Sequence, residues 1–111
     1  MGTNYYFRYK ICDGCGSYKE RHVGKSSGGW KFLFRAYPEH YDRPIIKTKD
    51  DWDVFIAAHP NGCIVDEYEL EHSIHDFWEM VESKQKEGPN MHYGEHDWID
   101  LGYSFCSSEF S

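Results

Sequence analysis

Two segments near the N-terminus, residues 4–11 and 30–36, alternate between apolar and polar side chains. A period of two is typical of a strand with one buried face, because successive side chains of a strand point to opposite faces of the sheet. The side chains predicted to point inward are Tyr5, Phe7, Tyr9 and Ile11 in the first segment and Trp30, Phe32, Phe34 and Ala36 in the second. Those predicted to point outward from the second segment are Lys31, Leu33 and Arg35. Residues 21–25 can return between the two segments, so the first third of the chain is predicted to be a three-stranded antiparallel meander.

Two capping signals predict helices in the remainder of the chain. Thr48 is followed three residues later by Asp51, which predicts a helix that runs to about residue 58. Ser73 precedes Asp76 with the same spacing, which predicts a second helix that closes at residues 88–89. The second helix would bury one apolar stripe, made of Ile74, Phe77, Trp78 and Val81.

Short strands are predicted at residues 63–66 and 69–72, on either side of a turn at 67–68. The last twenty residues are too apolar for a free tail and are expected to pack onto the sheet, with one strand near residues 102–106. The predicted fold class is therefore α+β. It consists of an antiparallel sheet that begins with the meander, two helices packed on one face, and a C-terminal segment packed on the sheet.

A chain of 111 residues is long enough for one hydrophobic core and too short for two, so residues 1–111 are expected to form a single domain. Aromatic residues make up 18% of the chain, which excludes a disordered segment. No apolar run approaches the length of a membrane span or of the core of a signal peptide. We therefore expect the protein to stay in the cytoplasm in which it is made and to bind no membrane.

The net charge of -7 is unevenly distributed along the chain. Residues 1–35 hold seven Lys or Arg side chains and two acids, whereas residues 36–111 hold five basic and seventeen acidic side chains. The N-terminal third can therefore attract an anion, while the rest of the chain repels the phosphates of a nucleic acid. A long nucleic-acid-binding surface is not expected.

Cys12 and Cys15 flank a two-residue Asp-Gly turn, a spacing that lets two thiolates converge on one tetrahedral metal ion. His22 follows on the returning strand and is the third predicted ligand of a structural zinc ion. The spacing does not identify the fourth ligand, for which the candidates are His40, His59, Cys63, His72 and Cys106. Two alternatives remain, namely small buried cysteines in a tight turn and, less favoured, a redox pair, which normally begins a helix.

The segment Gly-Lys-Ser-Ser-Gly-Gly-Trp at residues 24–30 resembles a phosphate-binding loop without being a P-loop, since that motif requires a glycine where this chain has Lys19. A glycine-rich turn exposes backbone N–H groups, and the neighbouring hydroxyls and cations can complete a concave anion site. The predicted ligand-binding residues are Tyr6, Arg21, Lys25, Ser26, Ser27, Gly28, Gly29 and Trp30. An ordinary hairpin turn with a solvated lysine explains the same residues equally well.

Enzyme activity is not expected from the remaining polar residues. The chain has no HExxH motif and no defensible Ser/His/Asp arrangement. His72 and His75 would be helical neighbours only if both lay in the second helix, and Ser73 as its cap places His72 outside.

The order of these motifs resembles a family of small bacteriophage-encoded proteins. The resemblance rests on Gly-Thr-Asn-Tyr-Tyr at residues 2–6, the CxxC pair, the segment from His22 to Trp30, and Asp-Glu-Tyr at residues 66–68. It covers most of the chain and implies an accessory protein that acts in the cytoplasm of an infected bacterial host. In the family a histidine stands near the end of the third strand, where this chain has Arg35, so the resemblance does not supply the fourth metal ligand.

Two functions follow from these expectations. The first is a non-enzymatic protein that binds a phosphate-bearing small ligand at the basic N-terminal sheet, and so sequesters a nucleotide signal of host defence. The alternative is a protein–protein inhibitor whose acidic C-terminal part docks on a basic host protein, a nucleic-acid-binding protein among them. Self-association and the roles of Cys63 and Cys106 stay open.

Overall fold

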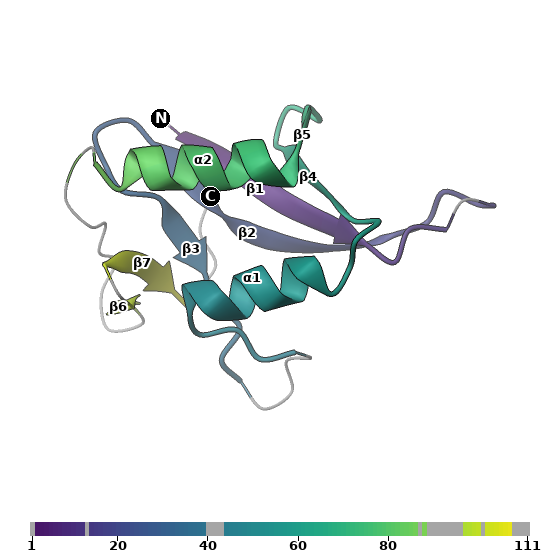
Figure 1. The fold of residues 1–111 in the computed structure, drawn as a ribbon, viewed down its shortest axis with the longest axis horizontal. Coiled ribbons are helices and arrows are strands. Elements are labelled where there is room, and N and C mark those ends of the chain that lie inside the picture. The colour runs from purple at the N-terminus through teal and green to yellow at the C-terminus, as the bar shows by residue number, and fades with distance from the viewer. Residues whose placement is uncertain are drawn as a thin grey trace.

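The computed structural model describes residues 2–12, 14–39, 44–86, 88, 97–100 and 102–107. They form a seven-stranded sheet with two helices on one of its faces (Figure 1). The strands are β1 (Gly2–Tyr9), β2 (Lys19–Ser27), β3 (Leu33–Arg35), β4 (Cys63–Asp66), β5 (Glu71–His72), β6 (Asp97–Asp100) and β7 (Tyr103–Cys106). The helices are α1 (Lys49–Ala57) and α2 (Ile74–Lys84). The predicted α+β class is confirmed.

The order of the strands across the sheet is β5-β4-β1-β2-β3-β7-β6. The first three strands are antiparallel neighbours in chain order, as the alternation predicts. The prediction that the whole sheet is antiparallel is wrong, because β7 pairs with β3 in parallel. The C-terminal residues accordingly extend the edge of the sheet rather than packing on its face. This pairing joins residues about seventy positions apart, which a local sequence pattern does not report.

The pairing of β1 with β2 contains one irregularity. Tyr5 lies opposite Gly24 and Tyr6 lies opposite His22, so that Val23 has no partner across the ladder. A bulge of this kind adds one residue to one strand and shifts the alternation of side chains beyond it. Residues 19–22 and residues 24–27 of β2 therefore follow opposite inward and outward patterns.

Several element boundaries differ from the predicted ones. The first strand ends at Tyr9, because Lys10 has a φ of 53° that turns the chain, and Ile11 is exposed instead of inward-facing. Trp30 lies in the turn after β2 and is also exposed. Leu33 points away from the helices, as predicted, but its side chain is fully buried rather than exposed. The strand β6 was not predicted at all.

Both helices begin at the predicted capping residues. The Thr48 side chain accepts a hydrogen bond from the backbone N–H of Asp51, and the Asp51 carboxylate accepts from the backbone of Thr48 at the start of α1. The Ser73 hydroxyl accepts from the backbone N–H of Asp76 at the start of α2. These bonds satisfy N–H groups that the helix leaves without partners. The helix α2 ends at Lys84, a turn earlier than predicted.

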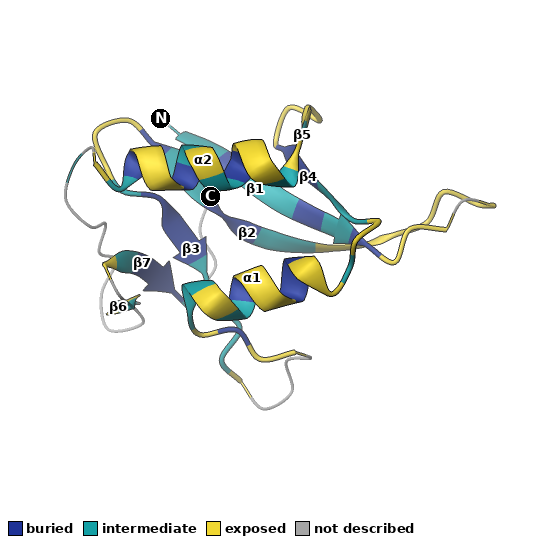
Figure 2. Ribbon diagram, in the orientation of Figure 1, coloured by how far each residue is buried: buried dark blue, intermediate teal, exposed yellow. Residues whose placement is uncertain are grey.

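One main hydrophobic cluster lies between the sheet and the two helices (Figure 2). It is built largely from aromatic rings, with Trp52 and Phe55 from α1 and Phe77 from α2 against Phe7 and Phe34 of the sheet. The inward sides of both helices are buried and their outward sides are exposed, as amphipathic helices require. No described helix is long and apolar enough to cross a membrane.

The opposite face of the sheet, which no described helix covers, is termed the helix-free face. Its side chains from the central strands are Asn4, Tyr6 and Arg8 of β1, Glu20, His22 and Lys25 of β2, and Leu33 and Arg35 of β3. Leu33 packs there with Cys106 in a second, small buried cluster. The rest of this face is polar and partly exposed, and the candidate site lies on it.

Gly24 is predicted to be essential for this sheet, whereas Gly28 is not. A Cβ on Gly24 would overlap the carbonyl oxygen of Leu33 and the ring of Phe32, while a Cβ on Gly28 would meet no atom within 4 Å. Gly24→Ala should therefore lower the free energy of unfolding by about 1–3 kcal/mol. Gly28→Ala, the matched control, should change it by about 0.5 kcal/mol or less. Urea denaturation of both variants provides the measurement, and equal stabilities would contradict the packing argument.

Candidate anion-binding site on the helix-free face

A chain of hydrogen bonds crosses the helix-free face between β4, β1 and β2. Glu67, just after β4, accepts bonds from the backbone N–H of Asn4 at 2.7 Å and from its side-chain amide nitrogen at 3.2 Å. The amide oxygen of Asn4 lies 2.9 Å from Nε2 of His22. Because the Asn4 nitrogen donates to a carboxylate, its oxygen is left as the acceptor, so His22 carries its proton on Nε2.

His22 is held neutral at physiological pH. Burial, and secondarily the positive charges of Arg35 and Lys25, lower the pKa of His22 to about 4. The backbone of Gly24 opposes this shift. The ring of Tyr6 lies beside the imidazole, with ring centroids 5.1 Å apart and planes inclined by 32°. A neutral imidazole and a phenol ring therefore lie side by side on this face as two tilted aromatic surfaces.

Lys25 and Arg35 supply positive charge beside this surface. Lys25 is opposite Asn4 in the β1–β2 ladder and opposite Leu33 in the β2–β3 ladder, so it shares their face. Its stem passes Gly2, where a Cβ would come within 2.7 Å of the Lys25 Cε. The glycine thus leaves room for the lysine to lie across β1.

The guanidinium of Arg35 has no acidic partner among the described residues. Its Nε is buried and has no hydrogen-bond acceptor, and its Cζ lies 4.9 Å from the centroid of the Tyr37 ring. The backbone of Arg35 is fixed by α1, since Nε1 of Trp52 donates to the Arg35 carbonyl at 2.9 Å. A buried donor without an acceptor is uncommon in proteins, and an arginine is well suited to bind an anion.

Arg8 lies on the same face but is neutralised by carboxylates. Its Nε donates to Glu20 at 2.8 Å and its Nη2 donates to Glu69 at 2.7 Å. The helix-free face therefore has an internally paired end at Arg8 and a cationic end at Arg35. We term the residues of the cationic end, Tyr6, His22, Lys25 and Arg35, the sheet-face cluster. All four are partly exposed.

The structure separates Arg21 from Lys25, although the sequence analysis placed both in one anion site. Arg21 lies on the helix-covered side, where its Nη1 donates to the Pro44 carbonyl at 2.9 Å. Its Cζ lies 4.5 Å from the ring centroid of Tyr37 and 5.1 Å from that of Phe55. The bulge at Val23 causes this separation, because regular alternation would have kept Arg21 and Lys25 on one face.

The predicted glycine-rich anion loop is largely part of a strand. Ser26 and Ser27 belong to β2 and point to opposite faces of the sheet. The Ser27 carbonyl accepts from Nζ of the buried Lys84 at 2.6 Å and from the backbone N–H of Trp30 at 3.2 Å. Gly28, Gly29 and Trp30 form the turn after β2, and all three are exposed. Ser27 shares the face of Lys25, since the Ser27 hydroxyl and the Lys25 Cε both lie within 2.7 Å of the place that a Cβ on Gly2 would take. Ser26 points to the other face of the sheet, so the predicted loop residues do not form one concave site.

The three predicted zinc ligands are not brought together either. Cys12 and Cys15 are adjacent and exposed at the tip of the β1–β2 hairpin, with the Cys15 thiol 3.1 Å from the Ser17 hydroxyl. Hydrogen bonds from Ser17, and secondarily from Cys12, lower the pKa of Cys15 to about 7. His22 lies three residues into the paired part of β2 and is bound to Asn4 instead.

None of the other predicted zinc ligands that the structure describes joins the pair. Among the described residues, the one group of three or more metal-ligating side chains is His75, Asp76 and Glu79. His40 lies outside the described residues. Cys63 faces away from the helices on β4, and Cys106 is buried beside Leu33. Nδ1 of His59 donates to the Phe55 carbonyl, and Nε2 of His72 is hydrogen-bonded to Asp66.

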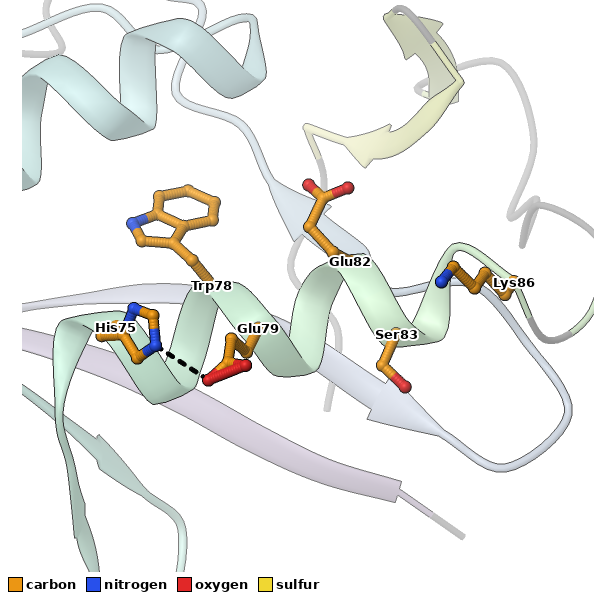
Figure 3. Close-up of a pocket in the computed structure, with 6 residues that line it drawn as sticks. All are labelled: His75, Trp78, Glu79, Glu82, Ser83 and Lys86. Atoms are coloured by element: carbon orange, nitrogen blue, oxygen red, sulfur yellow. Dashed lines mark ion pairs between the residues drawn. The ribbon is translucent and has the colours of Figure 1, made fainter.

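A shallow pocket of about 400 Å³ on α2 is lined by side chains of the helix and by Lys86 just beyond its end (Figure 3). His75 and Glu79 form an ion pair of 2.9 Å along the helix, and both side chains are largely exposed. They belong to the His75, Asp76 and Glu79 group, whose ligand atoms lie within 4.8 Å of one another. All three are exposed, and i,i+4 pairs of this kind are ordinary on exposed helix faces.

A second hollow, of about 410 Å³, lies where Pro44 and Ile45 approach the outer side of α1. It is mostly apolar, and it is lined by Val54 and Phe55 of the helix. Of its described polar lining residues, Asp51 caps α1 and His59 donates to the Phe55 carbonyl, so both are already engaged.

Sequence reasoning identified Tyr6 and Lys25 as ligand residues but missed Arg35 and assigned His22 to the metal. A signal for Arg35 was present, since the alternation of residues 30–36 placed it outward on the predicted sheet. No family model, curated protein or solved structure matches the chain. The function proposed below rests on the geometry of these side chains.

The lowered pKa of His22 predicts a specific loss of stability in mild acid. Below pH 6.5, His22 binds a proton in the unfolded chain but stays neutral in the folded chain. The free energy of unfolding therefore falls as the pH drops toward about 4. The loss should reach about 2 kcal/mol, after allowance for partial solvent screening.

Urea denaturation at a series of pH values measures this loss. His22→Gln should flatten the decline between pH 6.5 and 4 relative to the natural protein. His75→Gln, an exposed substitution on α2, is the control. A decline that is identical in the natural protein and in His22→Gln would show that another group causes it.

Proposed function

We propose that the protein is a non-enzymatic accessory protein that binds a phosphate-bearing small ligand on the helix-free face of its sheet. The phosphate would lie between Arg35 and Lys25, and the organic part of the ligand would lie on Tyr6 and His22. In the bacteriophage setting that the sequence resembles, such a protein sequesters a nucleotide signal of host defence in the host cytoplasm. The observation that carries the proposal is the Arg35 guanidinium, with its buried Nε lacking an acceptor.

The charge distribution of the face supports an anionic ligand. Lys25, His22 and Arg35 lie on one face of the neighbouring strands β2 and β3, and the charges of Arg35 and Lys25 both lower the pKa of His22. The nearest carboxylates are already engaged, Glu67 by two N–H groups of Asn4 and Glu20 by Arg8. A phosphate at Arg35 would gain charge-assisted hydrogen bonds without displacing an existing ion pair.

The neutral state of His22 supports a ligand with a flat organic part. A protonated imidazole would attract any anion, whereas the neutral ring offers a stacking surface that Tyr6 extends. Bases stack on aromatic side chains with little preference for sequence, worth about 1–3 kcal/mol for each base. Phosphate recognition and base stacking would thus contribute separately to the binding free energy, through adjacent residues. A nucleotide is the small ligand class that combines both.

Arg35→Gln should weaken nucleotide binding about tenfold, because one charge-assisted hydrogen bond to phosphate contributes about 1.5–3 kcal/mol. Isothermal titration calorimetry at low salt, with mono-, di- and cyclic nucleotides and with pyrophosphate, is the measurement. Binding should weaken as salt rises, since the Debye length falls to about 10 Å at 0.1 M salt. Tyr6→Leu should weaken nucleotide binding and leave pyrophosphate binding unchanged.

Lys86→Gln, an exposed position just beyond the end of α2, is the matched control, because it removes one positive charge away from the cluster. It should bind nucleotides like the natural protein. The absence of any heat at millimolar ligand, or equal affinities in Arg35→Gln and Lys86→Gln, would contradict the proposal. Circular dichroism of each variant establishes that it is folded.

The alternative function, inhibition of a basic host protein, is favoured by one observation on the turn between β4 and β5. Asp66 is buried there and accepts hydrogen bonds from the backbone N–H groups of Tyr68 and Leu70 and from Nε2 of His72. These bonds outweigh burial and lower the pKa of Asp66. The turn is therefore held rigid while Tyr68 and Leu70 remain 65% and 62% exposed.

Glu67, Glu69 and Glu71 flank these two apolar side chains and are themselves exposed. A preordered apolar tip within an acidic rim fits a partner with an apolar hollow surrounded by basic residues. Rigid presentation reduces the entropy lost when the partner binds.

The two functions make opposite predictions in an assay of phage plating on a host that carries a defence system. If the acidic turn acts, the Tyr68→Ser/Leu70→Ser double variant should lose protection of the phage while Arg35→Gln retains it. If the sheet-face cluster acts, the outcomes are reversed. Because both positions of the double variant are exposed, the fold should be retained, and thermal denaturation checks this.

A further inference from the structure

The loop between β1 and β2 carries two thiols away from the body of the protein. The last pair of the ladder is Tyr9 with Lys19, and the described residues of the loop beyond it are all exposed. The loop extends past both helices and past β4 (Figure 1). Its tip contains Cys12 and Cys15, which form no disulfide.

Backbone hydrogen bonds hold the two cysteines in a defined turn. The Gly16 N–H donates to the Cys12 carbonyl at 2.7 Å, and the Cys12 N–H donates to the Ser17 carbonyl at 2.8 Å. Gly16 has a φ of 76°, which a glycine adopts without strain. The Cys12 and Cys15 thiols lie within hydrogen-bond reach of each other. A Cys-x-x-Cys turn closed in this way presents two sulfur ligands to one side, as structural zinc sites require.

The turn nevertheless provides only half of a tetrahedral site. No other Cys, His, Asp or Glu in the described part of the chain comes within ligating distance of the two sulfurs. His22, the third ligand predicted from the sequence, is engaged by Asn4. A structural zinc ion takes four protein ligands, so two positions must be filled from outside the turn.

We propose that two copies of this chain meet tip to tip and share one zinc ion, which is bound by Cys12 and Cys15 of each copy. Because the loop projects from the body, two tips can approach without contact between the two sheets. The zinc site is completed only by the second copy. Zinc binding and dimer formation are therefore the same event.

The residues around the tip fit this arrangement. Four thiolates around one Zn²⁺ carry a net charge of about -2, and the exposed Lys10 and Lys19 of each copy lie at the neck of the loop to offset it. Ile11 and Tyr18 are exposed large side chains at the same neck, 39% and 46% accessible. A second copy that docks at the tip would remove part of this apolar surface from water.

Zinc titration of the reduced, metal-free protein tests the proposal. Zinc bound per chain and molecular mass by native mass spectrometry should give one zinc ion per two chains and a doubled mass, both reversed by chelator. Cys12→Ser and Cys15→Ser should stay monomeric and bind no zinc tightly. Cys63→Ser, which removes a thiol of β4 that is not part of the loop, is the control and should dimerise normally.

Cobalt substitution of the natural protein tests the ligand set without any variant, so the test stands even if a serine variant fails to fold. The thiolate-to-cobalt absorption per ion should correspond to four sulfur ligands in tetrahedral geometry. One zinc ion per chain without a change of mass, no tight zinc binding, or two sulfur ligands per cobalt would each overturn the proposal. So would zinc-dependent dimers that persist in folded Cys12→Ser and Cys15→Ser.

Discussion

The pairing of β1 with β2, with its single bulge at Val23, decides the chemistry of both faces of the sheet. Regular alternation would put Arg21, Val23 and Lys25 on one face. The extra residue keeps Arg21 and Val23 on the helix-covered side and sends Lys25 to the opposite side. Gly24 then lies opposite Tyr5, where the backbone of β3 and the Phe32 ring leave no space for a side chain. The core on one side and the cluster on the other both depend on this local geometry.

On the helix-free face Arg8 has acidic partners, whereas Arg35 has none among the described residues. Arg8 is bound by Glu20 and Glu69, and Glu67 is bound by Asn4, so this half of the face is electrically satisfied within the chain. Arg35 is held at the end of β3 by Trp52 and Tyr37, which contribute packing and no negative charge. Burial, together with the same positive charges that would attract a phosphate, keeps His22 neutral.

Local patterns predicted the local parts of the fold. The caps of both helices, the apolar stripe of α2 and the first antiparallel strands follow from interactions between residues close in sequence, which is why periodicity and capping residues reveal them. The parallel pairing of β7 with β3 and the existence of β6 depend on contacts between distant segments. Burial of Leu33 on the helix-free face likewise arises from packing with Cys106, far along the chain. The alternation predicts that Leu33 faces outward, but it does not indicate that Cys106 packs against its side chain.

By itself, the sequence determined that the N-terminal third is basic, that its strands carry aromatic residues, and that two thiols lie two residues apart in a turn. These properties depend on residue type and spacing, so Tyr6, Lys25, Cys12 and Cys15 could be named in advance. Only the tertiary structure decided which of them meet. It joined Lys25 with Arg35 and His22, placed Arg21 on the opposite face, and kept His22 apart from the cysteines. The physical reason is that a one-residue bulge changes the face of every side chain beyond it, and this shift is set by packing across three strands.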